Sequence, residues 1–240
     1  MRDFNKEAIS LEDKKYNYDF DGIVRDYMMK EFVPFFLDGP ALEIGCYEGD
    51  STVVLEKYFP DITVIEASSE AMKVTQSRVR KDIKFINSTI EDLDTTQKFN
   101  SIFLINTLEH LDNAVLALTK IKSLLSDHGR LFIVVPNADA PSRQIAVFMG
   151  LIETNNSVTK PEWVHGHRRT YSFDTLNFDI RVAGLKTFHR GGLLFKGLAN
   201  FQMDKALQAN IIDDKYLDGI YELGKIYPSF CSSIYSICTL

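Results

Sequence analysis

A glycine-bearing loop is the feature of this sequence whose residue types and spacing best suit chemistry. It reads Leu42-Glu43-Ile44-Gly45-Cys46-Tyr47-Glu48-Gly49-Asp50 and follows a short apolar run. Glycine in such a turn lets the backbone approach a ligand, and the first amides of the helix that follows are free to donate. The spacing is E-x-G-x-x-x-G without a lysine, which disfavours a pyrophosphate or triphosphate and favours a zwitterionic amino-acid group.

A second carboxylate ends the next β-rich run, about 20 residues beyond the loop. The run is Ile62-Thr63-Val64-Ile65-Glu66, and Ala67 and Ser68 follow it. In doubly wound folds a carboxylate at this place accepts hydrogen bonds from two ribose hydroxyls and disfavours a 2′-phosphate, so NADP is the least favoured nucleotide. The alternative is a structural role for Glu66, as an acidic residue near the N-terminus of the following helix.

His110 is the first candidate for acid–base chemistry. It stands in the triplet Glu109-His110-Leu111, and an imidazole titrates near neutrality and can accept a proton from a hydroxyl. The alternative is a histidine that only caps a helix or packs in the core.

A second group of polar side chains is the run Trp163-Val164-His165-Gly166-His167-Arg168-Arg169-Thr170-Tyr171. Neighbouring arginines bind phosphate or carboxylate in a bidentate manner. We therefore expect Arg168, Arg169 and Tyr171 to contact an anionic acceptor and either His165 or His167 to serve as a base. The alternative is a basic patch on the surface.

The elements that must position these residues alternate between strands and helices. Apolar runs predict strands over 41–44, 62–66, 83–87, 100–106 and 130–135. Helical spacing predicts helices over 21–37, 51–58, 69–80 and 112–126. This alternation predicts an α/β fold whose mostly parallel sheet is covered by helices on both faces.

The pattern changes after Pro136. Residues 137–172 read as a lid that faces the substrate, with one helical stretch over 145–152. A helix over 174–183, a strand over 184–190 and a helical insertion over 193–226 follow. The chain closes on a β-rich run over 231–239, which we expect to be the antiparallel edge partner of the sheet.

Composition limits the classes of function. The chain has 240 residues, 45% of them hydrophobic, which suits one well-cored domain. Its net charge of −6 argues against a nucleic-acid partner. Three cysteines without C-x-x-C spacing indicate neither a disulfide framework nor a zinc site. Without an apolar stretch of about 18 residues we expect no membrane partner and a cytoplasmic location.

From about residue 38 to 136 the chain resembles the class I S-adenosylmethionine-dependent methyltransferase superfamily, in its small-molecule, methyltransferase-23-like branch. The glycine motif and Glu66 carry the resemblance, as do the runs FNSIFLINTLEHL (99–111) and GRLFIVVPN (129–137). The resemblance implies a Rossmann-like, doubly wound sheet of seven strands with an antiparallel last strand in a three-layer αβα arrangement. It also implies one domain over 1–240, with an N-terminal cap helix (1–38), a cofactor-binding core (39–136), the lid (137–172) and a C-terminal part (173–240).

The resemblance further implies which residues hold S-adenosylmethionine and its product S-adenosylhomocysteine. Gly45 and Gly49 would lie near the methionine moiety, with Cys46 between them as a small apolar filler. Glu66, with Ala67 beside it, would bind the ribose hydroxyls. The remaining positions are Thr89 and Ile90 beside the adenine, Asn106 below the sulfonium, and Glu43, which orders the loop.

The expected activity is O-methylation of a small glycosidic or phosphorylated acceptor, and N-methylation remains open. Some relatives hold a divalent metal through E-x-x-E-H, but Asn106 stands at the first acidic position, so we expect no metal. The alternatives are a catalytically silent regulatory subunit, an NAD-dependent oxidoreductase, disfavoured by the missing third glycine, and a nucleic-acid methyltransferase, disfavoured by INTLEH after the fourth strand. Residues 193–226 are a candidate surface for a homodimer.

Overall fold

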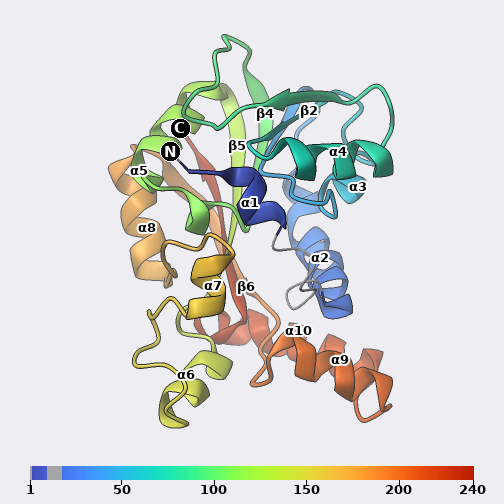
Figure 1. The fold of residues 1–240 in the computed structure, drawn as a ribbon, viewed down its shortest axis with the longest axis vertical. Helices are drawn as coiled ribbons and strands as arrows, with labels where there is room; N and C mark the ends of the chain where they lie inside the picture. The colour runs from blue at the N-terminus through green and yellow to red at the C-terminus, as the bar shows by residue number, and fades with distance from the viewer. Residues whose placement is uncertain (1, 10–17) are drawn as a thin grey trace.

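A seven-stranded sheet forms the centre of the computed structural model, which describes residues 2–9 and 18–240 (Figure 1). The strands are β1 (Ala41–Ile44), β2 (Ile62–Glu66), β3 (Lys84–Asn87), β4 (Phe99–Ile105), β5 (Leu125–Pro136), β6 (Lys186–Leu193) and β7 (Ser233–Thr239). Their order is β3-β2-β1-β4-β5-β7-β6. The pairs among β1 to β5 are parallel, and β7 runs antiparallel to both of its neighbours, which confirms the expected fold class.

The expectation that the last strand lies at the edge of the sheet is wrong. β7 lies between β5 and β6, and β6 takes the edge. The physical reason is burial: the five central residues of β7 are buried, whereas exposed and half-buried residues alternate over most of β6. A continuously buried strand needs neighbours on both sides, and an alternating one suits an edge.

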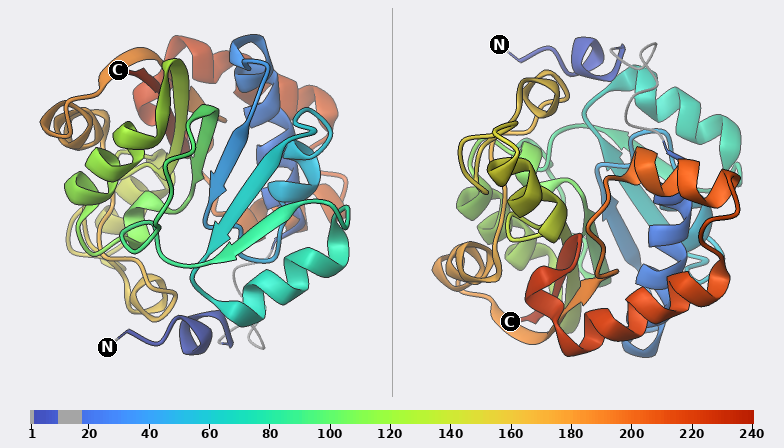
Figure 2. Two further views of the ribbon diagram at one scale, coloured as in Figure 1. Left: turned by 90° about the horizontal axis from the view of Figure 1, so that it is seen from above. Right: turned by 90° about the horizontal axis from the view of Figure 1, so that it is seen from below.

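Successive side chains of each strand point to opposite faces of the sheet, so one strand contributes side chains to the hydrophobic cores on both faces. Leu104 and Ile133 pack beneath α5 (Ala114–Leu124) and α8 (Phe173–Val182). Phe103 and Phe132 pack on the other face against α2 (Asp19–Phe32) and α3 (Thr52–Leu55). Figure 2 shows α5 and α8 on one side of the sheet and α2 on the other. Helix α4 (Ser69–Arg78) connects β2 to β3 along the chain.

Several helices differ from those expected from the sequence. Strands β1 and β2 have the predicted bounds, but β5 begins five positions early, at Leu125. The lid contains α6 (Pro141–Phe148) and also α7 (Lys160–Val164), which begins because Thr159 and Glu162 form a capping box. Residues 193–226 comprise the end of β6 and two helices, α9 (Asn200–Gln208) and α10 (Asp214–Ile226). Helix α1 (Phe4–Ile9) was not expected. The described residues also form three short 3-10 helices: η2 (Val33–Phe35), η3 (Leu108–His110) and η4 (Pro228–Phe230).

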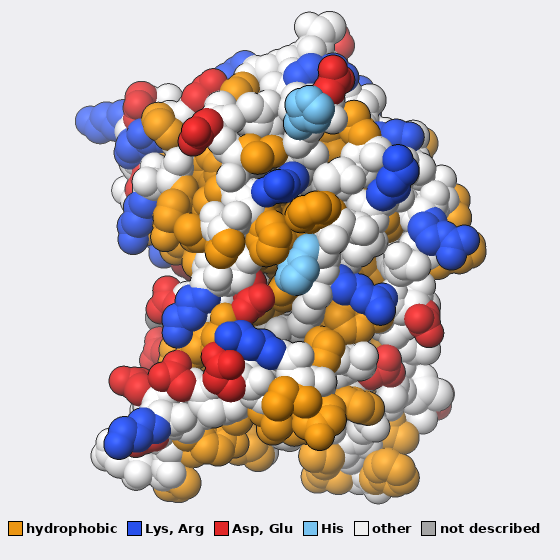
Figure 3. Space-filling model, turned by 180° about the vertical axis from the view of Figure 1, so that it is seen from behind, with side chains coloured by type: hydrophobic (Ala, Val, Ile, Leu, Met, Phe, Trp, Pro, Cys, Tyr) orange, Lys and Arg blue, Asp and Glu red, His pale blue; other side chains and the backbone are white. Residues whose placement is uncertain are grey.

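Exposed hydrophobic side chains gather at the end of the molecule where α6 and α10 lie (Figure 3). They include Phe148, the last residue of α6, with Met149 and Leu151 after it, and Ile226, the last residue of α10, with Tyr227 and Phe230 after it. The homodimer expected over 193–226 stays a prediction. None of the helices in the described part of the chain has the length and apolar character needed to span a membrane.

Candidate functional site

A cavity of about 1110 Å³ opens at the carboxyl ends of the parallel strands. Ile44, Ile65 and Ile105, at the ends of β1, β2 and β4, line its floor, and the loops that follow these strands form its walls. Residues of α1, α2, the lid and α9 close it from the other side. The cavity therefore lies where ligands bind in open α/β sheets.

The glycine loop is shaped by left-handed backbone conformations. Gly45 and Gly49 have φ values of +77° and +86°. A Cβ on Gly45 would lie 2.7 Å from Thr107 Oγ1, and one on Gly49 would lie 2.6 Å from Thr75 Cγ2. Glycine is thus required for the backbone conformation and for close packing of the loop on the protein. Gly45 lines the cavity directly, whereas Gly49 supports the loop from behind.

Cys46 lies between the glycines with its side chain almost fully buried. Its Sγ is 3.4 Å from Thr75 Oγ1. Burial raises the pKa of the Cys46 thiol, so the thiolate is disfavoured and the side chain acts as apolar packing at the cavity wall.

Glu66 joins the loops that follow β1 and β2. Its Oε2 accepts hydrogen bonds from the backbone amides of Cys46 at 3.0 Å and Tyr47 at 3.1 Å, and its Oε1 accepts one from Ser68 at 2.8 Å. An ionised carboxylate has about four acceptor sites, so Glu66 can receive further donors. It is half-buried and lines the cavity together with Ala67.

Glu43 lies beneath the loop and does not line the cavity. Its side chain is 1% exposed, and Oε2 accepts a hydrogen bond from Thr52 Oγ1 at 2.6 Å. Its other oxygen has no hydrogen-bond partner in residues 2–9 and 18–240. Burial, with the nearby charge of Glu66, raises the pKa of Glu43 to about 8. Glu43 therefore anchors the first residue of α3 and acts on the loop indirectly.

The positions expected beside the adenine and the sulfonium also line the cavity. Thr89 and Ile90 follow β3, and Thr89 Oγ1 donates to Asp92 Oδ2 at 2.9 Å. Asn106 follows β4 with a φ of +48°, a conformation that asparagine tolerates better than most residues. Its side chain is exposed to the cavity. The structure thus brings together Gly45, Cys46, Glu66, Ala67, Thr89, Ile90 and Asn106 around one cavity.

The two histidine motifs meet on another wall of the cavity. The rings of His110 and His167 have centroids 4.5 Å apart at 69°, and the backbone amide of Arg168 donates to the carbonyl of Glu109 at 2.8 Å. Burial lowers the pKa of His110 to about 3 and also lowers the pKa values of His165 and His167. All three histidines line the cavity as neutral imidazoles.

Glu109 lies beside these rings and is 1% exposed. Within the described part of the chain, neither of its carboxylate oxygens has a hydrogen-bond partner. Burial raises the pKa of Glu109 to about 8. An unpartnered carboxylate in this position is costly and calls for an explanation.

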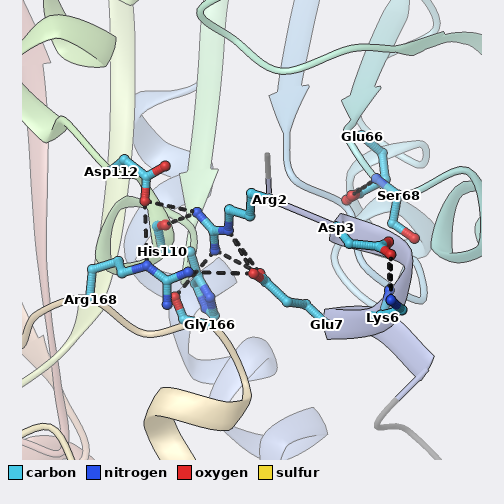
Figure 4. A network of polar contacts seen from close by, with 10 residues as sticks. All are labelled: Arg2, Asp3, Lys6, Glu7, Glu66, Ser68, His110, Asp112, Gly166 and Arg168. Carbon is cyan, nitrogen blue, oxygen red and sulfur yellow. Dashed lines mark hydrogen bonds and ion pairs between the residues drawn. The ribbon is translucent and has the colours of Figure 1, made fainter.

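Arg168 belongs to a network that joins the lid to α1 (Figure 4). Its guanidinium contacts Glu7 and Asp112, each at 3.4 Å. Arg2 shares both carboxylates, with Glu7 at 2.7 Å and Asp112 at 3.4 Å, and donates to the carbonyl of His110 at 2.6 Å. Two cations and two anions therefore neutralise one another beside the histidines.

The three residues expected to bind an anionic acceptor do not line the cavity. Arg168 is held in the network with Glu7 and Asp112, and Arg169 Nη2 donates to the carbonyl of Asp112 at 2.9 Å. Tyr171 is 2% exposed, and its hydroxyl donates to Asp179 Oδ2 at 2.9 Å. The polar side chains of this motif form ion pairs and hydrogen bonds with other elements. The sequence alone does not reveal these contacts.

Sequence reasoning missed Lys196, which lines the cavity and is 4% exposed. Its Nζ donates to the carbonyl of Leu198 at 2.8 Å and lies 5.5 Å from the ring of Phe20. Burial lowers the pKa of Lys196 to about 8. The sequence feature that could have indicated this residue is a single lysine after the apolar run Leu193-Leu194-Phe195.

Helix α1 was missed as well, although Arg2, Phe4 and Glu7 line the cavity. Asn5 Oδ1 accepts a hydrogen bond from Ser68 Oγ at 3.0 Å, which places α1 over the loop after β2. A helix of six residues is too short for hydrophobic periodicity to be read from the sequence.

Comparisons with known proteins agree with this architecture. Residues 20–189 match a family model described as a methyltransferase domain. A search of curated protein sequences finds no match. A solved structure from Thermotoga maritima, described as a SAM-dependent methyltransferase and possible histamine N-methyltransferase, has a TM-score of 0.65 at 17% identity and covers 97% of this chain and 96% of its own.

Two further solved structures contain S-adenosylhomocysteine. The N-methyltransferase NodS from Bradyrhizobium japonicum has a TM-score of 0.59 at 14% identity, with 97% of each chain covered. The plantazolicin methyltransferase BamL, with a triazolic desmethylPZN analog also bound, has a TM-score of 0.61 at 15% identity and covers 97% of this chain and 89% of its own. At these identities the likeness concerns the fold.

Proposed function

The chain belongs to the family of methyltransferase domains, and from that membership we propose that it transfers a methyl group to an oxygen or nitrogen of a small-molecule acceptor. Its cofactor is S-adenosylmethionine. The observation that carries the proposal is the position of Glu66, whose carboxylate organises the glycine loop and also faces the cavity.

The residues of the cavity fit this cofactor. Small-molecule cavities measure about 300–1,000 Å³, so about 1110 Å³ is enough for a cofactor with a small acceptor beside it. We assign the ribose hydroxyls to Glu66, the adenine to Thr89 and Ile90, and the methionine end to the loop at Gly45 and Cys46. When bound, S-adenosylmethionine supplies an activated methyl group on a sulfonium.

The charges of the cavity favour a neutral or cationic acceptor. Among the described residues, each arginine that lines the cavity is paired with a carboxylate: Arg2 with Glu7, Arg25 with Asp50 and Arg143 with Glu162. Among the described residues, a phosphorylated acceptor would meet no unpaired guanidinium there and a single ammonium group, that of Lys196. We therefore propose a sugar-like hydroxyl or an amine as the acceptor and regard a phosphorylated metabolite as less supported.

Methyl transfer requires the chain to align the acceptor and to remove its proton. His110, His165 and His167 are neutral and line the cavity, so their imidazoles can accept that proton. His110 is a weak base, because burial lowers its pKa to about 3. Lys196, with a pKa of about 8, is a further candidate for an amine or hydroxyl acceptor.

The decisive experiment is calorimetric titration of the purified chain with S-adenosylmethionine, S-adenosylhomocysteine and NAD, followed by a methyl-transfer assay. The acceptor panel contains neutral sugars, amines and their phosphorylated counterparts, and formation of S-adenosylhomocysteine is measured. We expect micromolar binding of both sulfur compounds, no binding of NAD, and turnover with an uncharged or cationic acceptor. Binding without turnover on any acceptor would favour a silent regulatory subunit, and preferential binding of NAD would favour an oxidoreductase.

A further inference from the structure

We propose that Glu109, His110 and His167 form a binding site for one divalent transition-metal ion on the wall of the cavity. One potential ligand atom from each side chain lies within 4.8 Å of the other two. The three residues come from two segments, η3 and the turn after α7, and all of them line the cavity.

The carboxylate of Glu109 is the first argument for a cation. It is 1% exposed, and neither oxygen has a hydrogen-bond partner among the residues that the structure describes. A buried carboxyl group ionises only beside a partner of opposite charge, which a coordinated metal ion would supply. The nearby guanidiniums of Arg2 and Arg168 do not supply one, because both are engaged with Glu7 and Asp112.

The two imidazoles are the second argument. They lie against each other at a steep angle, with centroids 4.5 Å apart and planes at 69°, so their nitrogens can converge on one point. Two donor atoms at about 2.1 Å from a tetrahedral ion lie roughly 3.4 Å apart, so atoms that now lie within 4.8 Å of one another must approach by at most about 1.4 Å. The bond between the Arg168 amide and the Glu109 carbonyl already holds the two segments together.

The ligand set selects the kind of metal. Two nitrogen donors and one carboxylate suit Zn²⁺, Fe²⁺, Co²⁺ or Mn²⁺ better than Mg²⁺ or Ca²⁺, which prefer oxygen ligands. This inference replaces the expectation of no metal, which rested on Asn106 standing where an acidic ligand would be. The third ligand comes instead from His167, in the lid.

Three protein ligands leave positions of the ion for an oxygen of the acceptor, and this use of the site rests on the function proposed above. An ion lowers the pKa of a bound hydroxyl and orients it. An imidazole bound to a metal cannot also remove a proton, so that role would pass to His165 or Lys196, which also line the cavity.

The test is titration of the EDTA-treated, full-length chain with Co²⁺ alone, in the absence of S-adenosylmethionine, followed by its visible absorption spectrum and by competition with Zn²⁺. We expect one Co²⁺ per chain, with d–d bands that Zn²⁺ abolishes. Glu109→Gln and His167→Ala should each weaken binding by more than about tenfold. His128→Ala, which removes an exposed histidine, is the matched control and should change nothing.

Circular dichroism and thermal unfolding of the metal-free variants separate loss of a ligand from loss of the fold. Glu109→Gln should stay folded, because it replaces an unpartnered buried carboxylate by a neutral amide of the same size. Absence of Co²⁺ binding, or binding unchanged in both ligand variants, overturns the site. Binding of S-adenosylhomocysteine is measured in parallel without metal. If S-adenosylhomocysteine binds and Co²⁺ does not, the metal site is wrong and the methyltransferase function stands. If Co²⁺ binds and S-adenosylhomocysteine does not, the metal site stands and the proposed function is wrong.

Discussion

The carboxylate of Glu66, at the end of β2, accepts a hydrogen bond from the backbone amide of Cys46, just after β1, at 3.0 Å. This bond links the acidic strand end to the glycine loop across the floor of the cavity. The side chain that holds the loop is thus also the one to which we assign the ribose hydroxyls.

The first prediction concerns this side chain. Glu66→Ala should weaken binding of S-adenosylhomocysteine by more than about tenfold, because a hydrogen bond to a charged group contributes about 1.5–3 kcal/mol. Glu66→Gln should be intermediate, since its amide keeps one acceptor oxygen. Calorimetry measures the affinities, and Glu70→Ala, an exposed carboxylate paired with Lys73, is the control. Unchanged affinity in Glu66→Ala would show that Glu66 serves only the loop.

The second prediction concerns Gly49. Gly49→Ala forces a side chain into a left-handed conformation and places a Cβ 2.6 Å from Thr75 Cγ2. Strain of about 1–3 kcal/mol from the backbone and a similar amount from overpacking should lower the free energy of unfolding and weaken cofactor binding.

Gly150→Ala is the matched control for Gly49→Ala, because Gly150 has a φ of +71° but no atom of the described residues lies within 4 Å of the position that its Cβ would take. It should lose stability from the backbone strain alone. Adding Thr75→Ser, which removes Cγ2, should recover part of the loss in Gly49→Ala. Equal losses in the two glycine variants, measured by urea unfolding, would contradict the packing argument.

The third prediction concerns pH and Glu43. Its pKa is raised to about 8 in the folded chain, so the native state binds an additional proton that the unfolded chain releases above pH 4.5. The contribution of this proton to the free energy of unfolding is fully present at low pH and is lost as the pH rises toward 8. Between pH 5.5 and 7.5 the wild type should lose roughly 2 kcal/mol relative to Glu43→Gln, which does not titrate.

Urea unfolding of wild type and Glu43→Gln at several pH values, in the presence of a chelator, measures this difference. Glu109 titrates in both proteins and cancels in the comparison. A difference between the two proteins that is constant across this pH window would mean that Glu43 is ionised in the folded state.

The fourth prediction concerns the lid. Replacing Arg168 and Arg169 together by Ala removes the contacts to Glu7 and Asp112. We expect faster hydrogen exchange over residues 160–168 and over α1, and a rise of roughly threefold to tenfold in KM for neutral and phosphorylated acceptors alike, equivalent to about 1 kcal/mol.

Arg181→Ala, on the exposed face of α8, is the control for the lid variant and should leave exchange and KM unchanged. A loss confined to phosphorylated acceptors, with unchanged exchange, would instead support an anion clamp. That result would also argue against the neutral or cationic acceptor proposed here.

The sequence by itself determined the cofactor half of the molecule. The bounds of β1 and β2, the glycine loop and Glu66 are encoded locally, because strand periodicity, glycine spacing and the position of a carboxylate at a strand end can be read within a few tens of residues. Parallel strands place their carboxyl ends at one edge, so these residues had to converge.

Only the tertiary structure decided the rest. The place of β7 between β5 and β6, the engagement of Arg168 with Glu7, and the meeting of Glu109 with His167 all join segments far apart in the chain. Such contacts depend on which faces and loops pack together, and the free energy of that packing is shared among distant residues rather than written in any local pattern. Periodicity therefore predicted the strands and the loop, whereas burial and pairing decided which charged side chains face the cavity.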